Sequence, residues 1–262
     1  MYYYVYDSFV QDPKWTREVD LIETRLTDLG ISGKIARLAL FRDPIEMIRD
    51  AVRRGAKTVI ALGNDVTLRH VIDAVGDTGA AIGIIPLGKE QNEIADLLGV
   101  PRGVEACNIL SSRIIEELDI GQVNDKRFLH QLSFACGPGF EVKCDDFVIK
   151  PMRKGEIQVR NMTGEQEDGY VASPVDGLLD LIIQQPGKGI FGSRKVHTSA
   201  FPVDEIIITS PDSVTLIADG ETLTATELRI SVIPKHLQVI TGKNRQFIRP
   251  LENSSRIDSK LN

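Results

Sequence analysis

Two carboxylates flank a single glycine late in the sequence, as Asp219, Gly220 and Glu221 in the run LIADGETL. Side chains two positions apart in a strand point to the same face, and at a tight turn they can converge on one water or metal ion. Paired carboxylates raise one another's pKa, so one of them can act as a general base. Asp-Gly is equally a hairpin turn signal, with Glu221 then starting the next strand. Spacing alone leaves both interpretations open.

A second polar group follows the apolar run TVIAL and consists of Gly63, Asn64, Asp65, Val66 and Thr67. A small residue at a strand end lets backbone N–H groups approach a phosphate, and a helix that starts there adds its positive dipole end. Asp65 offers oxygen ligands for Mg²⁺, and Thr67 offers a hydroxyl. The alternative is an ordinary strand-to-helix turn in which Asp65 or Thr67 caps the helix.

A third polar group, PLGKEQNE, follows the apolar run AAIGII. Pro86 and Gly88 shape this loop, and Asn92 and Glu93 stand near the start of the next helix. The alternative is an ordinary strand-to-helix connection with Asn92 as its cap. Further along, SPVDGLLDLII offers the oxygen-bearing side chains of Ser173, Asp176 and Asp180.

Several other kinds of site are excluded by composition and spacing. The four histidines are dispersed and the three cysteines form no CxxC pair, so neither a zinc site nor a disulfide framework is expected. The net charge is −6 with scattered basic residues, which argues against nucleic acid as a partner. No apolar run reaches the roughly 18 residues that span a bilayer, and no signal peptide is evident. We therefore expect a reduced, cytoplasmic protein.

The first half of the chain predicts elements that would place the polar groups together. Strand-like and helix-like runs alternate there, which is typical of an open parallel sheet covered by helices. Ligands of such sheets bind outside the carboxyl ends of the strands, where both loops lie. The expected strands cover 2–7, 34–41, 57–62 and 80–87, and the expected helices cover 16–29, 44–54, 67–75 and 92–98.

The second half of the chain has a different residue pattern. Short β-like runs are separated by turn residues at sandwich-like spacing, beginning with a hairpin turn at Asn124 and Asp125. The last four of these runs cover 204–210, 213–218, 227–233 and 236–240. The fold class predicted is therefore α/β followed by all-β. We expect an α/β nucleotide-binding domain over 1–112 and a β-sandwich domain over 113–241. The polar tail over 242–262 is expected to be frayed, with Phe247 and Ile248 as a docking point if it docks.

In their order, these motifs resemble those of the diacylglycerol kinase catalytic family. That family includes bacterial lipid kinases and sphingosine kinases and is related to NAD kinases. Its GGDGT motif corresponds to residues 63–67, and its P-x-G-T-x-N-D motif to 86–93 with one extra residue. Its G-F-D-A, D-G-L-L-D and D-G-E motifs correspond to 139–142, 176–180 and 219–221. The resemblance covers residues 34–241.

The resemblance implies ATP-dependent phosphorylation of a lipid hydroxyl, of the diacylglycerol or sphingoid type, in a cleft between two domains. It implies ATP and Mg²⁺ as cofactors and transient contact with a membrane surface, and it leaves a homodimer open. The residues implied to bind nucleotide are Gly63, Asn64, Asp65, Thr67, Gly88, Lys89, Asn92 and Glu93. Asp219 and Glu221 match the catalytic carboxylates, Asp65 a Mg²⁺ ligand, and Ser173, Asp176 and the Leu178 carbonyl a structural Mg²⁺ site.

The sequence also departs from the family pattern. Asn64 and Val66 replace two motif glycines, and a β-branched residue does not readily take a positive φ. Lys89 replaces a threonine, and YDSFVQDP stands where the family carries the phosphate loop N-P-x-S-G. Three hypotheses follow: a divergent lipid kinase, an NAD kinase-like enzyme that phosphorylates a ribose hydroxyl, and a non-catalytic nucleotide- or lipid-binding protein that has lost its phosphate loop.

Overall fold

The structure is a computed structural model that describes residues 1–38, 43–88, 90–144, 146–166, 168–188 and 194–247. Its first part is a parallel sheet with helices on both faces. The strands are β1 (Tyr2–Tyr6), β2 (Lys34–Arg37), β3 (Thr58–Gly63) and β4 (Ala81–Pro86). The helices are α1 (Thr16–Asp28), α2 (Pro44–Arg53), α3 (Asp65–Val75), α4 (Glu93–Leu97) and α5 (Glu105–Ser112).

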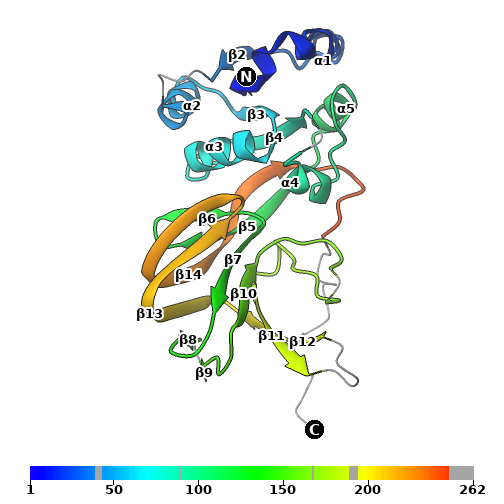
Figure 1. Cartoon of the computed structure of the whole chain (residues 1–262). Helices are drawn as coiled ribbons and strands as arrows, with labels where there is room; N and C mark the ends of the chain where they lie inside the picture. Colours follow the sequence, from blue (N-terminus) through cyan, green and yellow to red (C-terminus); the bar gives the residue numbers. More distant parts are fainter. Residues whose placement is uncertain (39–42, 89, 145, 167, 189–193, 248–262) are drawn as a thin grey trace.

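The parallel strands are arranged in the order β2-β1-β3-β4. Every residue of β3 and β4 is buried, as expected for strands covered on both faces. Figure 1 shows α2 and α3 on one side of these strands and α1 and α5 on the other. Asp43 caps α2 as its sequence predicts, because its carboxylate accepts a hydrogen bond from the backbone of Ile45 at 2.9 Å.

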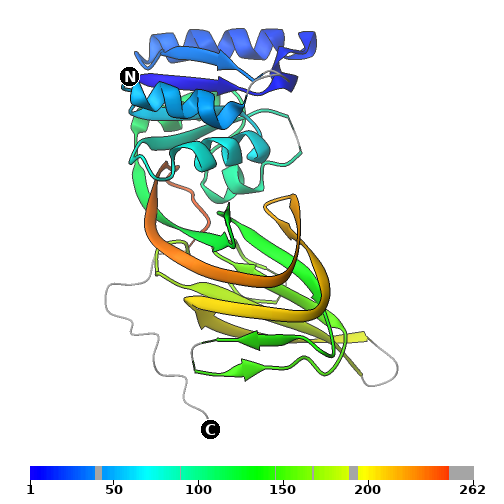
Figure 2. The ribbon, with the colours of Figure 1, turned by 90° about the vertical axis from the view of Figure 1, so that its left-hand side faces the viewer.

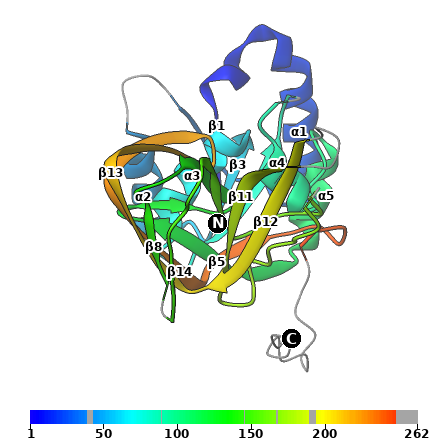
Figure 3. The ribbon, with the colours of Figure 1, turned by 60° about the horizontal axis from the view of Figure 1, so that its bottom comes forward.

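The second part is almost entirely antiparallel, and its main strands are arranged in the order β12-β11-β10-β7-β13-β14. The last strand, β14, also pairs in parallel with β4, so one continuous sheet joins the two parts. Figures 2 and 3 show that β13 and β14 bend strongly along their length. The strands are β5 (Ile115–Val123), β6 (Lys126–Phe128), β7 (Gln131–Cys136), β8 (Glu141–Lys143), β9 (Val148–Ile149), β10 (Gly155–Arg160), β11 (Leu179–Lys188), β12 (Arg194–Val203), β13 (Glu205–Ala218) and β14 (Glu221–Ile240).

The buried apolar side chains form two clusters, one in each part. The first cluster also includes Leu237, Val239 and Ile240 at the end of β14, together with Phe247 beyond it. The tail therefore docks at Phe247 as predicted, while residues 248–262 lie outside the described part of the chain. The separation into two clusters accords with a two-domain organisation, but the boundary at residue 112 stays a prediction.

The predicted fold class is confirmed, and the differences concern individual elements. The runs 204–210 and 213–218 were expected as two strands but form one strand, β13, with an irregular register between Thr209 and Val214. The runs 227–233 and 236–240 likewise join in β14, where Lys235 takes a φ of 50°. Both strands continue because pairing resumes beyond each irregularity. Helix α5 was not predicted, since it is short and no side chain of the described residues caps it.

Helix α3 and strand β2 also differ in extent from their predictions. Helix α3 begins at Asp65, two residues earlier than expected, because Asn64 caps it. Strand β2 ends at Arg37, and residues 39–42 of the predicted strand lie outside the described part of the chain.

Candidate functional site

A pocket of about 310 Å³ lies where the loops of the parallel part face the antiparallel strands. Asp65 and Glu93 line it from the first part, at the starts of α3 and α4. His130 and Asp219 line it from the second part, beside β7 and at the turn between β13 and β14. Asp65 and Asp219, which lie 154 positions apart in the sequence, thus line one space.

The turn between β3 and α3 is held by Asn64. Its side-chain oxygen accepts hydrogen bonds from the backbone N–H groups of Val66 at 3.0 Å and Thr67 at 3.3 Å. The backbone N–H of Asn64 in turn donates to the Thr67 hydroxyl. The interpretation as an ordinary capped turn is therefore correct for the local structure, although Asn64 is the cap rather than Asp65 or Thr67. Gly63 is required because a Cβ there would lie 2.2 Å from the Thr67 hydroxyl oxygen.

Asp7 lies at the end of β1, where the family carries its phosphate loop. Its carboxylate accepts a hydrogen bond of 2.5 Å from the buried Thr67 hydroxyl and another of 3.3 Å from the backbone of Phe9. The carboxylate of Asp7 and the amide oxygen of Asn64 therefore accept hydrogen bonds from donors at the start of α3. Donors at the start of a helix are groups that commonly bind phosphate in proteins.

Asp65 joins the two loops of the parallel part. Its backbone N–H donates to the Gln91 carbonyl at 2.8 Å, and its Oδ2 accepts from the backbone of Ile94 at 3.1 Å, so it caps α4. Its Oδ1 is buried and has no hydrogen-bond partner among the residues that the structure describes. Burial raises the pKa of this carboxyl from its ordinary value of 3.8 to about 7 despite the opposing backbone donors. The two oxygens of Asp65 thus differ, since Oδ2 caps α4 and Oδ1 accepts no hydrogen bond from the described residues.

The raised pKa of Asp65 predicts a pH-dependent stability. The folded carboxyl keeps its proton up to about pH 7. The unfolded one releases it near its ordinary pKa, so stability falls as pH rises between these values, by up to about 1.4 kcal/mol per unit. Asp65→Asn keeps an acceptor for Ile94 but cannot ionise. Denaturant titrations of wild type and Asp65→Asn at pH 4 to 8 should show that the difference between their free energies of unfolding changes up to pH 7 and stays constant above it. A difference that does not depend on pH would contradict the raised pKa of Asp65.

The second predicted loop is organised by Asn92 rather than capped by it. Asn92 is buried, and its amide donates to the carbonyls of Gly88 at 3.2 Å and Glu90 at 3.1 Å. Gly88 takes a φ of 82°, a backbone conformation that favours glycine. Asn92 makes no side-chain cap bond, because Asp65 occupies that role. Lys89 lies outside the described residues.

The Asp-Gly-Glu motif forms a tight hairpin turn in which Ala218 pairs with Glu221. The Asp219 carboxylate accepts from the backbones of Leu129 at 2.6 Å, His130 at 3.1 Å and Gln131 at 3.0 Å. Burial raises the pKa of Asp219, and these donors oppose the rise. Glu221 does not line the pocket and instead pairs with Arg69 at 3.5 Å and Lys126 at 4.0 Å.

The sequence offered no reason to select His130, although the structure places it in the pocket. Its backbone N–H donates to Asp219, and its Nδ1 lies 3.6 Å from an oxygen of Glu93. Burial lowers the pKa of the imidazole, against the effect of Asp219, so the ring favours its neutral form. A lone histidine without a partner at metal-ligand spacing gives no signal in the sequence, and only the fold reveals its position in the pocket.

The predicted structural Mg²⁺ residues lie apart from the pocket, around the loop between β10 and β11. Ser173 is buried, and the Asp176 carboxylate accepts from the backbone of Leu178 at 3.1 Å. None of the three lines the pocket of Asp65 and Asp219. Within the described residues, no three acidic, histidine or cysteine side chains cluster in the manner of a metal site. Asp119 braces this loop by accepting from the backbone of Gly177 at 2.7 Å.

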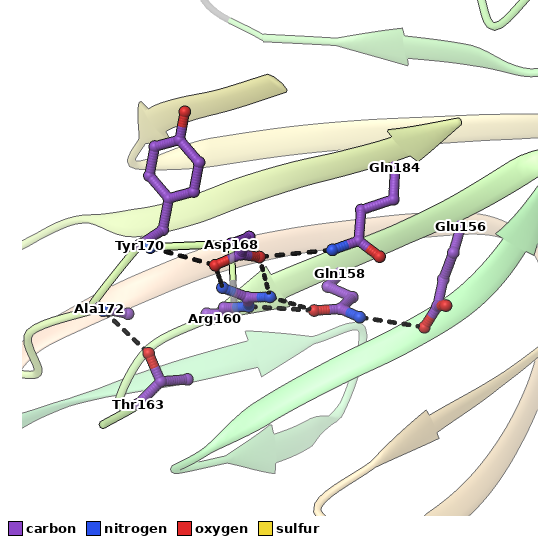
Figure 4. Close-up of polar contacts among 8 residues, drawn as sticks. All are labelled: Glu156, Gln158, Arg160, Thr163, Asp168, Tyr170, Ala172 and Gln184. Atoms are coloured by element: carbon purple, nitrogen blue, oxygen red, sulfur yellow. Dashed lines mark hydrogen bonds and ion pairs between the residues drawn. The ribbon is translucent and has the colours of Figure 1, made fainter. Parts of the chain in front are cut away.

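The same loop is anchored to the sheet by a buried ion pair (Figure 4). Arg160 on β10 makes two hydrogen bonds to the carboxylate of Asp168, at 3.1 and 2.7 Å. Gln158 accepts from Arg160, and Gln184 donates to Asp168. The loop is thereby fixed to two neighbouring strands.

Comparison with known proteins identifies the family that these motifs resemble. The sequence signature of the diacylglycerol kinase catalytic domain matches residues 12–123. A probable lipid kinase YegS-like protein of Pseudomonas aeruginosa strain PAO1 is 33% identical over 97 residues, which cover 36% of this chain and 32% of that relative. Another protein of that name, from Pseudomonas savastanoi pv. phaseolicola, is 24% identical over 244 residues, covering 75% of this chain and 80% of the relative.

The fold is also shared with solved structures. A diacylglycerol kinase from Bacillus anthracis str. Sterne superposes with a TM-score of 0.73 at 16% identity, covering 92% of this chain and 97% of that one. The expected resemblance to the diacylglycerol kinase catalytic family is confirmed. The first of the sequence matches, however, spans only about a third of the relative's length. None of the helices in the described part of the chain has the length and apolar character to cross a bilayer.

Proposed function

We propose that this lipid kinase-like chain, with its diacylglycerol kinase catalytic region over residues 12–123, transfers the γ-phosphate of ATP to a lipid hydroxyl. The acceptor would be an alcohol of the diacylglycerol or sphingoid type. One observation carries the proposal: Asp65 and Asp219 line a single pocket, although they belong to loops in opposite parts of the chain. Transfer needs both substrates positioned and charge neutralised, which a two-sided pocket provides.

In the proposed reaction, the acceptor oxygen forms a bond to the γ-phosphorus and the bond to the bridging oxygen breaks, leaving its electron pair on ADP. The hydroxyl proton passes to Asp219, whose carboxylate is held in place by three backbone donors. The neutral imidazole of His130 lies beside it as a further polar contact for the acceptor. Arg69 fixes this turn from α3 by donating to the Asp219 carbonyl at 3.2 Å.

The residues of the pocket fit a magnesium ion, which prefers carboxylate and phosphate oxygens. Within the described part of the chain, Asp65 Oδ1 is a buried oxygen without a hydrogen-bond partner, and Glu93, whose carboxylate is exposed, lines the same pocket. These two residues would hold Mg²⁺ together with the nucleotide. The ion would supply neutralisation of the phosphate charge.

A second candidate function is non-catalytic binding of a nucleotide or lipid. It is favoured by the oxygens of Asp7 and Asn64, which already satisfy the donors at the start of α3. A carboxylate at the end of β1 would also repel a triphosphate at short range. The NAD kinase-like hypothesis predicts transfer to a ribose hydroxyl, and no contact in the pocket favours it over the other two.

Titration calorimetry with Mg·ATP, combined with a phosphate-transfer assay on vesicles containing diacylglycerol or sphingosine, tests these functions. We expect Mg·ATP binding and a phosphorylated lipid product. Asp7→Asn removes the negative charge but keeps an acceptor for Thr67, so it should tighten Mg·ATP binding several-fold. NAD offered in the same assay as acceptor tests the ribose hypothesis. Nucleotide or lipid binding without any product would overturn the kinase proposal in favour of the second candidate.

A further inference from the structure

A groove of about 540 Å³ crosses the antiparallel sheet next to the pocket of Asp65 and Asp219. Ser133 on β7 and Ile217 on β13 line both the pocket and the groove. These two residues are directly paired in the sheet, so their side chains share a face. The groove therefore begins where the proposed transfer site ends, and the two hollows share one wall.

The groove is hollow because small side chains lie along its middle. Ala135 follows Ser133 on the same face of β7, and the backbone of Gly155 on β10 also lines the groove. A side chain on Gly155 would lie 2.3 Å from the Gln184 carbonyl, so the strand requires a glycine there. Longer side chains on both sides of these small residues then form the walls of the groove.

The two walls differ in chemistry. Ile217 forms the apolar wall near the pocket, and Val196 on β12 closes the far end. These side chains are 52% and 57% exposed, although both are large and apolar. Between these ends the lining is polar, because Glu156 pairs with Ala135 in the sheet and accepts a hydrogen bond of 3.2 Å from Gln158, which in turn contacts Arg160 (Figure 4). Exposed apolar groups that continue from a polar pocket suit a ligand with a polar head and an apolar chain.

We propose that this groove binds one alkyl chain of the lipid acceptor and so directs its hydroxyl into the pocket of Asp65 and Asp219. The inference rests on the proposed function for the identity of the acceptor. The occupant is an acyl or sphingoid chain because the groove is continuous with the transfer site and its exposed ends are apolar. Val196 at the far end would then contact the distal part of the chain, whereas the pocket would hold the head.

The test is equilibrium binding of a fluorescent monoacylglycerol with a long acyl chain, without nucleotide, to wild type and Val196→Glu. A carboxylate at the groove's end must be desolvated when an alkyl chain binds, so affinity should fall about tenfold or more. Val148→Glu is the matched control, because Val148 is 51% exposed on β9, does not line the groove, and undergoes the same change. Ala135→Trp should block the middle of the groove and weaken binding similarly.

A transfer assay on the same proteins separates the groove from the chemistry. Val196→Glu should raise the KM for long-chain acceptors about tenfold and leave kcat and short-chain acceptors unchanged. Probe binding that is equal in wild type, Val196→Glu and Val148→Glu, or absent in wild type, would overturn the groove assignment. Binding that depends on Val196 without any transfer by wild type would retain the groove and remove the proposed kinase function.

Discussion

Asp219→Asn is expected to reduce phosphoryl transfer about 10²- to 10⁴-fold, the usual contribution of a general base. Asp219 is the carboxylate of the Asp-Gly-Glu turn that lines the pocket. Glu221 is turned toward Arg69 and Lys126 instead. Glu221→Gln should therefore lower the rate only a few-fold, by loosening the contact of Arg69 with the turn. Initial rates at saturating Mg·ATP and lipid measure both effects.

The Asp219 variant needs a structural control, since its carboxylate also accepts three backbone hydrogen bonds. An asparagine has one acceptor oxygen, and its amide would face a donor, so some loss of stability is expected. Thermal unfolding and Mg·ATP binding should be measured beside the rate, and intact binding with lost turnover supports the base assignment. If Asp219→Asn keeps its rate while His130→Gln loses it, the proton acceptor is His130 and the assignment is wrong.

The parallel part of the fold was predictable because its signals are local. Continuous apolar runs gave β3 and β4, and Asp43 with Pro44 marked the start of α2. The rule that ligands bind at strand carboxyl ends also selected Asp65, which lines the pocket, while its role in binding stays a prediction. The prediction of the antiparallel part was less accurate, because the local breaks at Pro211 and Lys235 do not reveal that strand pairing resumes beyond them.

The roles of individual site residues depend on contacts that sequence does not encode locally. Asp65 caps α4 through Ile94, which lies 29 residues further along the chain. Asp7 reaches Thr67 across 60 residues, and Asp219 reaches Leu129 across 90. Each of these pairs forms only when the sheet brings distant loops together, so spacing could suggest the residue types but not their partners.

Arg160→Met is expected to destabilise the protein by about 3–5 kcal/mol, because it leaves the Asp168 carboxylate buried without its partner. The side chains of Arg160 and Asp168 are only 3% and 8% exposed, and their contact is bidentate. Burial alone would raise the pKa of Asp168, yet the guanidinium holds it below its ordinary value. The lowered pKa means that this stabilisation is present near neutral pH and is lost as pH falls through the folded pKa.

The double variant Arg160→Met with Asp168→Leu distinguishes a lost ion pair from a lost side chain. Removing both charges eliminates the buried carboxylate, so most of the stability lost in Arg160→Met should return. Denaturant titrations of wild type, both single variants and the double variant measure the coupling.

The loop that Asp168 anchors also contains Ser173 and Asp176, so Arg160→Met should loosen it before global unfolding. Hydrogen exchange at Tyr170 and Ala172, whose N–H groups bond to Asp168 and Thr163, would report that loosening. Unchanged exchange and a stability loss below about 1 kcal/mol would show that the pair does not anchor the loop.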